Sequence, residues 1–215
     1  MFSHVFAVEI IDAFVSRWMY IELLNASRIV GRENLWIFNV KDRCELEKLS
    51  SIAGLVEHDS IISRIEDLGK IFRVVVLDPE APEELKPSDF TGRTLVVVGG
   101  IMGDHPPRGR TRKEVTWKLK GRFIARNLGP GQFTIDGAIY MARAIAFGRT
   151  LQSIPVQRGL ILRGDGFEVH LPYAYPLENG SVVISREEVD YILNKLEEDE
   201  ARALSDGKTP SICSD

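Results

Sequence analysis

The residues Gly99–Arg110 (GGIMGDHPPRGR) combine several groups that can bind a ligand or transfer a proton. The glycines in this stretch allow a ligand to approach the backbone closely, because they carry no Cβ atom. Asp104 contributes a carboxylate and His105 an imidazole, whose unperturbed pKa of about 6.5 lets it accept a proton near neutral pH. The two prolines that follow prevent a helix from beginning at once, and Arg108 adds a positive charge. This combination predicts a ligand-binding loop rather than a simple turn.

The ligand expected in this loop carries no phosphate group. The stretch lacks the spacing of a P-loop and the G-x-G-x-x-G pattern that opens a helix in dinucleotide-binding proteins. Phosphate groups are usually bound at the N-terminus of a helix that follows the strand directly. The two prolines prevent a helix from beginning there. S-adenosylmethionine, which joins an adenosine to a sulfonium and an amino acid, fits a pocket of backbone groups and apolar walls.

The elements that would position this loop alternate between strands and helices. Strands are indicated by β-branched and apolar runs, and helices by apolar residues at helical spacing and by stop signals. The predicted strands are Ser3–Ile10, Leu35–Val40, Ile71–Leu77, Thr94–Ile101 and Arg122–Leu128. The predicted helices are Ala13–Val30, Glu45–Ile52, Ser60–Leu68, Arg112–Lys120 and Thr134–Phe147. This alternation predicts an α/β domain with a largely parallel sheet over residues 1–147.

The sequence after Gly148 has a different character. Gly159–Pro172 reads as a β-hairpin, and Val182–Ile184 as a short strand. The capping box S-x-x-E at Ser185–Glu188 predicts a helix that reaches about Leu204. We therefore expect residues 148–204 to form a small hairpin-and-helix appendage, and residues 205–215 to form a disordered tail.

The composition is that of an ordinary globular protein, with 215 residues, 44% hydrophobic and 27% charged residues, and a net charge of −4. No run of about 18 apolar residues occurs, and the N-terminus does not resemble a signal peptide, so no membrane association is expected. Cys44 and Cys213 lie far apart, which argues against a disulfide framework and favours a reducing, cytoplasmic setting. The histidines are scattered, so no metal site is expected. Residues 108–126 are strongly basic, with Glu114 as the single acidic residue. They could contact nucleic acid or form a solvated face.

Three stretches together resemble a known family. They are VVVLDP at Val74–Pro79, GGIMGDHPPRGRT at Gly99–Thr111 and RNLGPGQFTIDGAI at Arg126–Ile139. Over most of residues 1–147 the chain is similar to the SPOUT superfamily of knotted methyltransferases, and GDHPPR is the most specific part of the match. Within the superfamily it resembles the branch of archaeal proteins described as probable S-adenosylmethionine-dependent RNA methyltransferases. The same branch contains a fungal enzyme that methylates an arginine of a small-subunit ribosomal protein. The resemblance implies a C-terminal trefoil knot built from about residues 74–146.

The resemblance also implies that three loops form a pocket for S-adenosylmethionine. The residues expected to contact this cofactor are Leu77, Asp78, Pro79, Gly99, Gly100, Ile101, Gly103, Leu128, Gly129, Gln132, Phe133 and Thr134. A branched side chain at Gly100 would fill the pocket, so Gly100→Val is expected to abolish cofactor binding. SPOUT enzymes commonly dimerise across the knot, but the appendage could cap that surface, so a homodimer and a monomer both remain open.

The acceptor of the methyl group decides which side chains act in catalysis. A guanidinium stays protonated at neutral pH, with a pKa above about 12, so an arginine acceptor needs carboxylates that orient it and take its proton. Asp104 and Glu9, at the end of the first strand, form the expected pair, with His105 as a further proton acceptor. An RNA acceptor would instead use Arg108 and Arg110 to hold phosphate, with Asp104 or His105 as the base.

Each of these residues also has a structural interpretation. Asp104 could fix the backbone of its own turn, Glu9 could pair with an arginine, and Arg108 could anchor Asp104. The sequence leaves open which residue is the general base and which atom is methylated.

The function that the sequence favours is methyl transfer from S-adenosylmethionine to the translation apparatus. An arginine of a ribosomal protein is the preferred acceptor, and rRNA or tRNA is the alternative. A non-catalytic module that binds RNA or the ribosome is the alternative from another class, and it would bind no S-adenosylmethionine.

Overall fold

The computed structural model describes residues 4–103, 108–207 and 210–214. Within these ranges the main sheet has six parallel strands in the order β3-β2-β1-β5-β4-β6. The strands are β1 (His4–Ile10), β2 (Leu35–Phe38), β3 (Leu55–Val56), β4 (Arg73–Leu77), β5 (Thr94–Gly100) and β6 (Phe123–Arg126). Because the strands are parallel, their carboxyl ends lie at one edge of the sheet, where ligands of open α/β sheets bind. The predicted α/β class with a largely parallel sheet is confirmed, whereas the knot stays a prediction.

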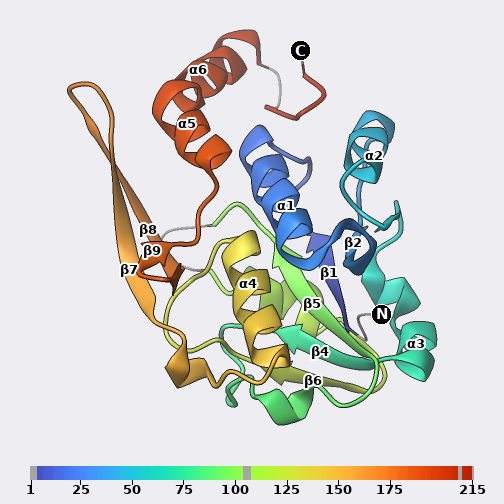
Figure 1. Ribbon diagram of the computed structural model, residues 1–215. Helices are drawn as coiled ribbons and strands as arrows, with labels where there is room; N and C mark the ends of the chain where they lie inside the picture. The colour runs from blue at the N-terminus through green and yellow to red at the C-terminus, as the bar shows by residue number, and fades with distance from the viewer. Residues whose placement is uncertain (1–3, 104–107, 208–209, 215) are drawn as a thin grey trace.

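Helices cover both faces of this sheet. They are α1 (Arg17–Val30), α2 (Arg43–Ser50), α3 (Ile61–Ile71) and α4 (Ile135–Ala146). Short 3-10 turns lie at Arg32–Asn34, Pro87–Asp89 and Leu151–Ser153, and a π-helical turn at Arg112–Thr116. Figure 1 shows α1 and α4 side by side in front of the sheet. Among the described residues, no helix has both the length and the apolar character needed to cross a bilayer.

The alternation of side chains along β1 divides the interior into two cores. Phe6 and Val8 pack with α1 and α4 on one face of the sheet, whereas Val5 and Ala7 pack with α3 on the other. This is the two-residue period of a strand that is buried on both faces. The direction of every side chain on β1 follows from it, including that of Glu9.

Capping side chains fix the residues at which the helices begin. Ser16 Oγ accepts a hydrogen bond from Met19 N at the start of α1 (3.1 Å), and Thr134 Oγ1 accepts one from Gly137 N at the start of α4 (3.2 Å). The predicted strands and helices of residues 1–147 are found with shifted ends. The helix expected over Arg112–Lys120 is reduced to the π-helical turn, and the two-residue strand β3 was not predicted.

The C-terminal part forms a separate antiparallel sheet and two helices. The elements are β7 (Val156–Arg163), β8 (Glu168–Glu178), β9 (Ser181–Val182), α5 (Arg186–Asn194) and α6 (Leu196–Asp206). Figure 1 shows the β7–β8 ribbon projecting past the main sheet. Tyr175 and Ile192 join this part to Trp18 of α1 in a small apolar core. The predicted hairpin is present, and the predicted long helix is broken at Lys195. The division into domains stays a prediction.

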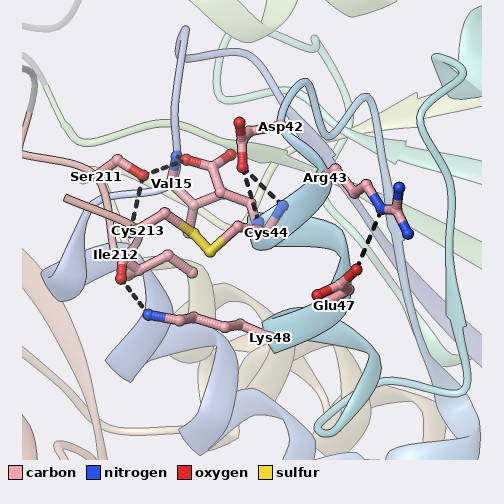
Figure 2. Close-up of a disulfide and its surroundings, with 10 residues drawn as sticks. Val15, Asp42, Arg43, Cys44, Glu47, Lys48, Ser211, Ile212 and Cys213 are labelled. Atoms are coloured by element: carbon pink, nitrogen blue, oxygen red, sulfur yellow. Dashed lines mark hydrogen bonds and ion pairs between the residues drawn. A yellow bond between two sulfur atoms is a disulfide. The ribbon is translucent and has the colours of Figure 1, made fainter. Parts of the chain in front are cut away.

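The tail carries the clearest correction to the sequence-based expectations. Cys213 forms a disulfide with Cys44 of α2, with 6.2 Å between the two Cα atoms (Figure 2). Beside it, Ser211 Oγ donates a hydrogen bond to Glu45 Oε1 (2.6 Å), and Ile212 N donates one to Val15 O (2.9 Å). The expected absence of a disulfide was therefore wrong, as was disorder for residues 210–214. Residues that are 169 positions apart along the chain can still meet in space, and the tail forms hydrogen bonds both with α2 and with Val15.

Removal of this disulfide is expected to lower the free energy of unfolding by about 2–4 kcal/mol. The bond links the first third of the chain to its end, so its loss enlarges the ensemble of unfolded conformations. Urea denaturation of the Cys44→Ser, Cys213→Ser double variant measures the effect. A reductant should lower the stability of the wild type to the level of this variant and leave the variant unchanged. A wild type that keeps its stability after complete reduction, verified by thiol titration, would contradict the expectation.

Candidate functional site

A cavity of about 320 Å³ opens where β4, β5 and β6 end. The three loops that leave these strands form its walls, and the first turns of α4 close it on one side. The predicted cofactor residues that line it are Leu77, Asp78, Pro79, Gly99, Ile101, Leu128, Gly129, Gln132, Phe133 and Thr134. The structure thus brings together residues from three distant stretches of sequence, as expected for parallel strands that end at one edge.

Gly100 does not face this cavity. A Cβ atom on Gly100 would lie 2.9 Å from Val8 Cγ1 and 3.0 Å from Ile10 Cδ1, so its side chain would press against β1. The reason given for the effect of Gly100→Val is therefore wrong: the variant would disturb the packing of β5 on β1 and would not fill the pocket. Gly99 is the cavity residue of the pair, and its Cβ would lie 2.6 Å from Thr111 Oγ1.

Gly103 lies at the border between the cavity and the appendage. A Cβ atom there would lie 2.6 Å from both Gln132 Nε2 and Tyr173 Cε1. Only a residue without a side chain lets the chain pass between the loop after β6 and strand β8. A glycine is thus required at position 103 because two other parts of the same chain lie close to its backbone.

Two polar side chains hold the first and third loops in shape. Asp78 is buried, and its Oδ2 atom accepts a hydrogen bond from Arg112 Nε (3.1 Å). Asn127 Nδ2 donates to Ala81 O (2.8 Å), and its Oδ1 atom accepts from Gly129 N (2.8 Å). These contacts fix the cavity walls, because they tie each loop to a partner elsewhere in the chain or to its own backbone.

The proposed catalytic residues are distributed unevenly around the cavity. Arg108 is exposed and lines it. Asp104 and His105 lie outside the described residues. Glu9 lies on the opposite face of the sheet from the cavity, because it shares the direction of Ala7 in β1.

Glu9 has a structural task in the described chain. Its two carboxylate oxygens accept hydrogen bonds from Ser60 Oγ (2.5 Å) and Ile61 N (2.9 Å), at the start of α3. Burial raises the pKa of Glu9, and these hydrogen bonds and the charge of Lys41 oppose the increase. The structure does not bring Glu9 into the cavity, so we do not carry it forward as a partner of Asp104.

A group of buried carboxylates lies behind the cavity wall. Glu22 of α1, Asp136 of α4 and Glu188 of α5 are each at most 4% exposed. Glu22 Oε2 accepts a hydrogen bond from Ile135 N (2.8 Å), which fixes the beginning of α4. Burial, and the charge of Asp136, raise the pKa of Glu188 to about 8. Burial also raises the pKa of Glu22, with the charges of Glu188 and Asp136 adding to the effect.

The basic stretch 108–126 is partly neutralised by carboxylates, several of them distant in sequence. Its ion pairs include Arg110–Asp12 (2.6 Å), Arg112–Asp78 (3.1 Å), Lys118–Glu114 (2.5 Å) and Arg126–Asp89 (2.9 Å). A count of charges within this stretch includes Glu114 but could not include Asp12, Asp78 and Asp89. The argument for a nucleic-acid surface is correspondingly weaker.

Several residues at the site were not predicted. They are Asp12, Glu80, Thr111, Asn127 and Tyr173. Asn127 had a usable signal, since an asparagine often fixes a turn by accepting a hydrogen bond from the backbone two residues on, here at Gly129 before Pro130. Tyr173 had none, because its place depends on how the appendage packs on the main sheet.

The fold and the cavity define a class of protein. Three loops at the carboxyl edge of a parallel α/β sheet form the ligand site, and the loop after β5 lacks the sequence pattern of a phosphate-binding loop. The dual-specific Trm10 of Thermococcus kodakaraensis shares the fold in its crystal structure. Its TM-score is 0.52 at 14% identity, over 68% of this chain and 94% of that one. The predicted SPOUT class of fold is thereby confirmed.

The chain belongs to the SFM1-like family of protein arginine N-methyltransferases, whose model matches residues 5–199. It is 30% identical to protein arginine N-methyltransferase SFM1 of Saccharomyces cerevisiae (strain ATCC 204508 / S288c). That match covers 94% of this chain and 98% of the yeast protein. The crystal structure of yeast SFM1 complexed with SAM has a TM-score of 0.77 at 28% identity, over 89% of this chain and 91% of that one.

Proposed function

We propose that this protein transfers a methyl group from S-adenosylmethionine to an arginine side chain of a protein. The observation that carries the proposal is the match to yeast SFM1 over nearly the whole of both chains. The match includes the appendage, whose strand β8 pairs through Ala174 with the cavity-lining residues Gln132 and Phe133. Family membership and the cavity therefore point to the same activity.

The cavity suits this cofactor in size and in chemistry. Its walls include the apolar side chains of Val98, Leu128, Phe133 and Ala138, which can enclose an adenine ring. The Glu80 carboxylate, on a side chain that is 53% exposed, lies at the same wall, where hydroxyl groups of a ribose can donate hydrogen bonds to it. When bound, S-adenosylmethionine supplies a methyl group activated by attachment to a positively charged sulfur.

The protein must position the acceptor and remove one proton from it. The new bond joins a guanidinium nitrogen to the methyl carbon, and the bond from that carbon to sulfur breaks. Asp104 is proposed to orient the guanidinium and to take its proton, with His105 as a second acceptor. Arg108, exposed at the rim of the cavity, is proposed to bind an anionic group beside the acceptor arginine. Positioning of this kind contributes much of the rate of a displacement reaction.

The acceptor is proposed to be a protein of the small ribosomal subunit. The resemblance to the fungal branch enzyme supports it, as does the partial neutralisation of residues 108–126. RNA remains the competing acceptor, and a single labelling experiment separates the two.

Small ribosomal subunits of the source organism are incubated with the enzyme and S-adenosylmethionine carrying a tritiated methyl group, and protein is then separated from RNA. We expect label in one protein, recovered as methylarginine after hydrolysis, and none with Asp104→Ala enzyme. Label in RNA would replace the protein acceptor with a nucleic acid. Cofactor binding without label in either fraction would reject the ribosomal acceptor, and no cofactor binding at all would reject the enzymatic function.

A further inference from the structure

The loop that carries Asp104 and His105 is held at both of its ends by one carboxylate. Asp12 follows β1, and its Oδ2 atom accepts a hydrogen bond from Met102 N (2.8 Å), just before the loop. Its Oδ1 atom lies 2.6 Å from Arg110 Nη2, just after the loop. A single side chain therefore ties the entry of the loop to its exit.

The position of Asp12 is itself fixed by the sheet. Ile11 N donates a hydrogen bond to Gly100 O (2.9 Å), which extends the pairing of β1 and β5 beyond the strand ends. Asp12 is partly buried, with 18% of its side chain exposed, and the side chain of Arg110 is 29% exposed. Arg110 also lines the cavity. The pair thus connects a rigid strand end to the rim of the cofactor site.

A second contact holds the loop from the side of the appendage. Tyr173 Oη donates a hydrogen bond to Gly103 O (3.1 Å), and the tyrosine ring lies against Gly103. The next residue of β8 is tied to the cofactor loop, because Ala174 N donates to Gln132 O (2.8 Å). Gly103 is therefore confined between two elements that are joined to each other.

We propose that Asp12 is a positioning residue for methyl transfer, which acts by holding Met102 and Arg110, the two ends of this loop, in place beside the cavity lining. Tyr173 supports the same loop from the other side. The inference rests on the proposed function for its chemistry, and on the contacts of Asp12 for its geometry. A carboxylate is required at this position. An asparagine oxygen can still accept a hydrogen bond from Met102 N, but a neutral amide cannot form an ion pair with the guanidinium of Arg110.

The main test compares Asp12→Asn with the wild type in methyl transfer to small ribosomal subunits. We expect kcat to fall about 10- to 100-fold, since small displacements of reacting groups have effects of this size. The Kd for S-adenosylmethionine should change less than about twofold, and Tm by less than about 2 °C. A role in stability alone would lower Tm and leave kcat unchanged, and that result would overturn the proposal.

A double-mutant cycle that combines Asp12→Asn with Arg110→Met tests whether Asp12 acts on kcat through Arg110. If Asp12 acts through Arg110, the double variant should be no slower than the slower single variant. Fully additive losses would contradict the pairing. Asp42→Asn is the matched control, because Asp42 also accepts backbone N–H groups, at the start of α2, but lies away from the cavity. It should keep the wild-type kcat.

Exchange of the Met102 amide hydrogen tests the contact of Asp12 independently of the proposed methyl transfer. The Met102 amide should exchange about tenfold faster in Asp12→Asn than in the wild type, because its acceptor is weakened. This measurement needs no methyl acceptor. Unchanged exchange would reject the contact of Asp12 with the loop, whether or not an acceptor is found, whereas faster exchange in a protein that methylates nothing would reject only the proposed function.

Discussion

Replacement of Ala138 by phenylalanine is expected to weaken the binding of S-adenosylmethionine at least about 100-fold while the protein stays folded. Ala138 is 7% exposed, and it lies on the wall of the cavity that α4 contributes. A phenyl ring there would occupy space that the adenosine needs. The loops cannot retreat easily, because Asn127 and the Ala174–Gln132 hydrogen bond hold them. A 100-fold loss corresponds to about 2.7 kcal/mol of binding free energy, and isothermal titration calorimetry measures it directly.

Ala146→Phe is the control for this prediction. It places the same ring on the same helix at a partly exposed position outside the cavity lining. This variant should bind the cofactor as the wild type does. If Ala138→Phe also bound normally and melted at the wild-type temperature, the cofactor would have to occupy a different site.

The stability of the protein is expected to fall as the pH rises from about 5 to 8.5, because of the buried carboxylates. Glu188 has a pKa of about 8 in the folded protein, against a reference value of 4.5. A carboxyl group whose pKa is raised by folding stabilises the protein below the unfolded pKa. That contribution is lost as the pH rises through the folded value. Glu22, Asp136 and the hydroxyl of Tyr175 face the same group and shift in the same direction.

Glu188→Gln tests the origin of this pH dependence. The amide cannot ionise, and its oxygen can still accept the hydrogen bond that Trp18 Nε1 donates to Glu188. We expect its Tm to exceed that of the wild type by about 5 °C or more at pH 8.5, and to differ little at pH 5. Glu187→Gln, at the exposed neighbouring position paired with Arg28, should keep the wild-type profile. Identical profiles for the wild type and Glu188→Gln would refute this account.

Much of the fold could be predicted because its signals are local. The β-branched runs around Val75 and Val97 and the helical spacing after Thr134 are properties of neighbouring residues, which packing then confirms. The three loops of the cavity were implied by the resemblance to the SPOUT superfamily, which rests on short runs of neighbouring residues such as Gly99–Thr111.

The errors arose where a residue's partner is distant in sequence. Glu9 ends a strand as expected, yet the alternation that sends Val8 toward α4 sends Glu9 toward α3. Attention to that alternation would have excluded it from the cavity. Asp12 escapes the alternation because it lies beyond the strand. The bond between Cys44 and Cys213 had no local signal, since it depends on where the whole chain ends in space.

The loop bearing Asp104 is held by residues that are made at very different times. Asp12 is made before Tyr173 and Ala174, and Cys213 is made later than all three. A nascent chain that stops before β8 would already contain every residue expected to contact the cofactor. It would still lack the strand that confines Gly103 and Gln132. Confinement of the two loops thus depends on β8, a strand that is made after every residue expected to contact the cofactor.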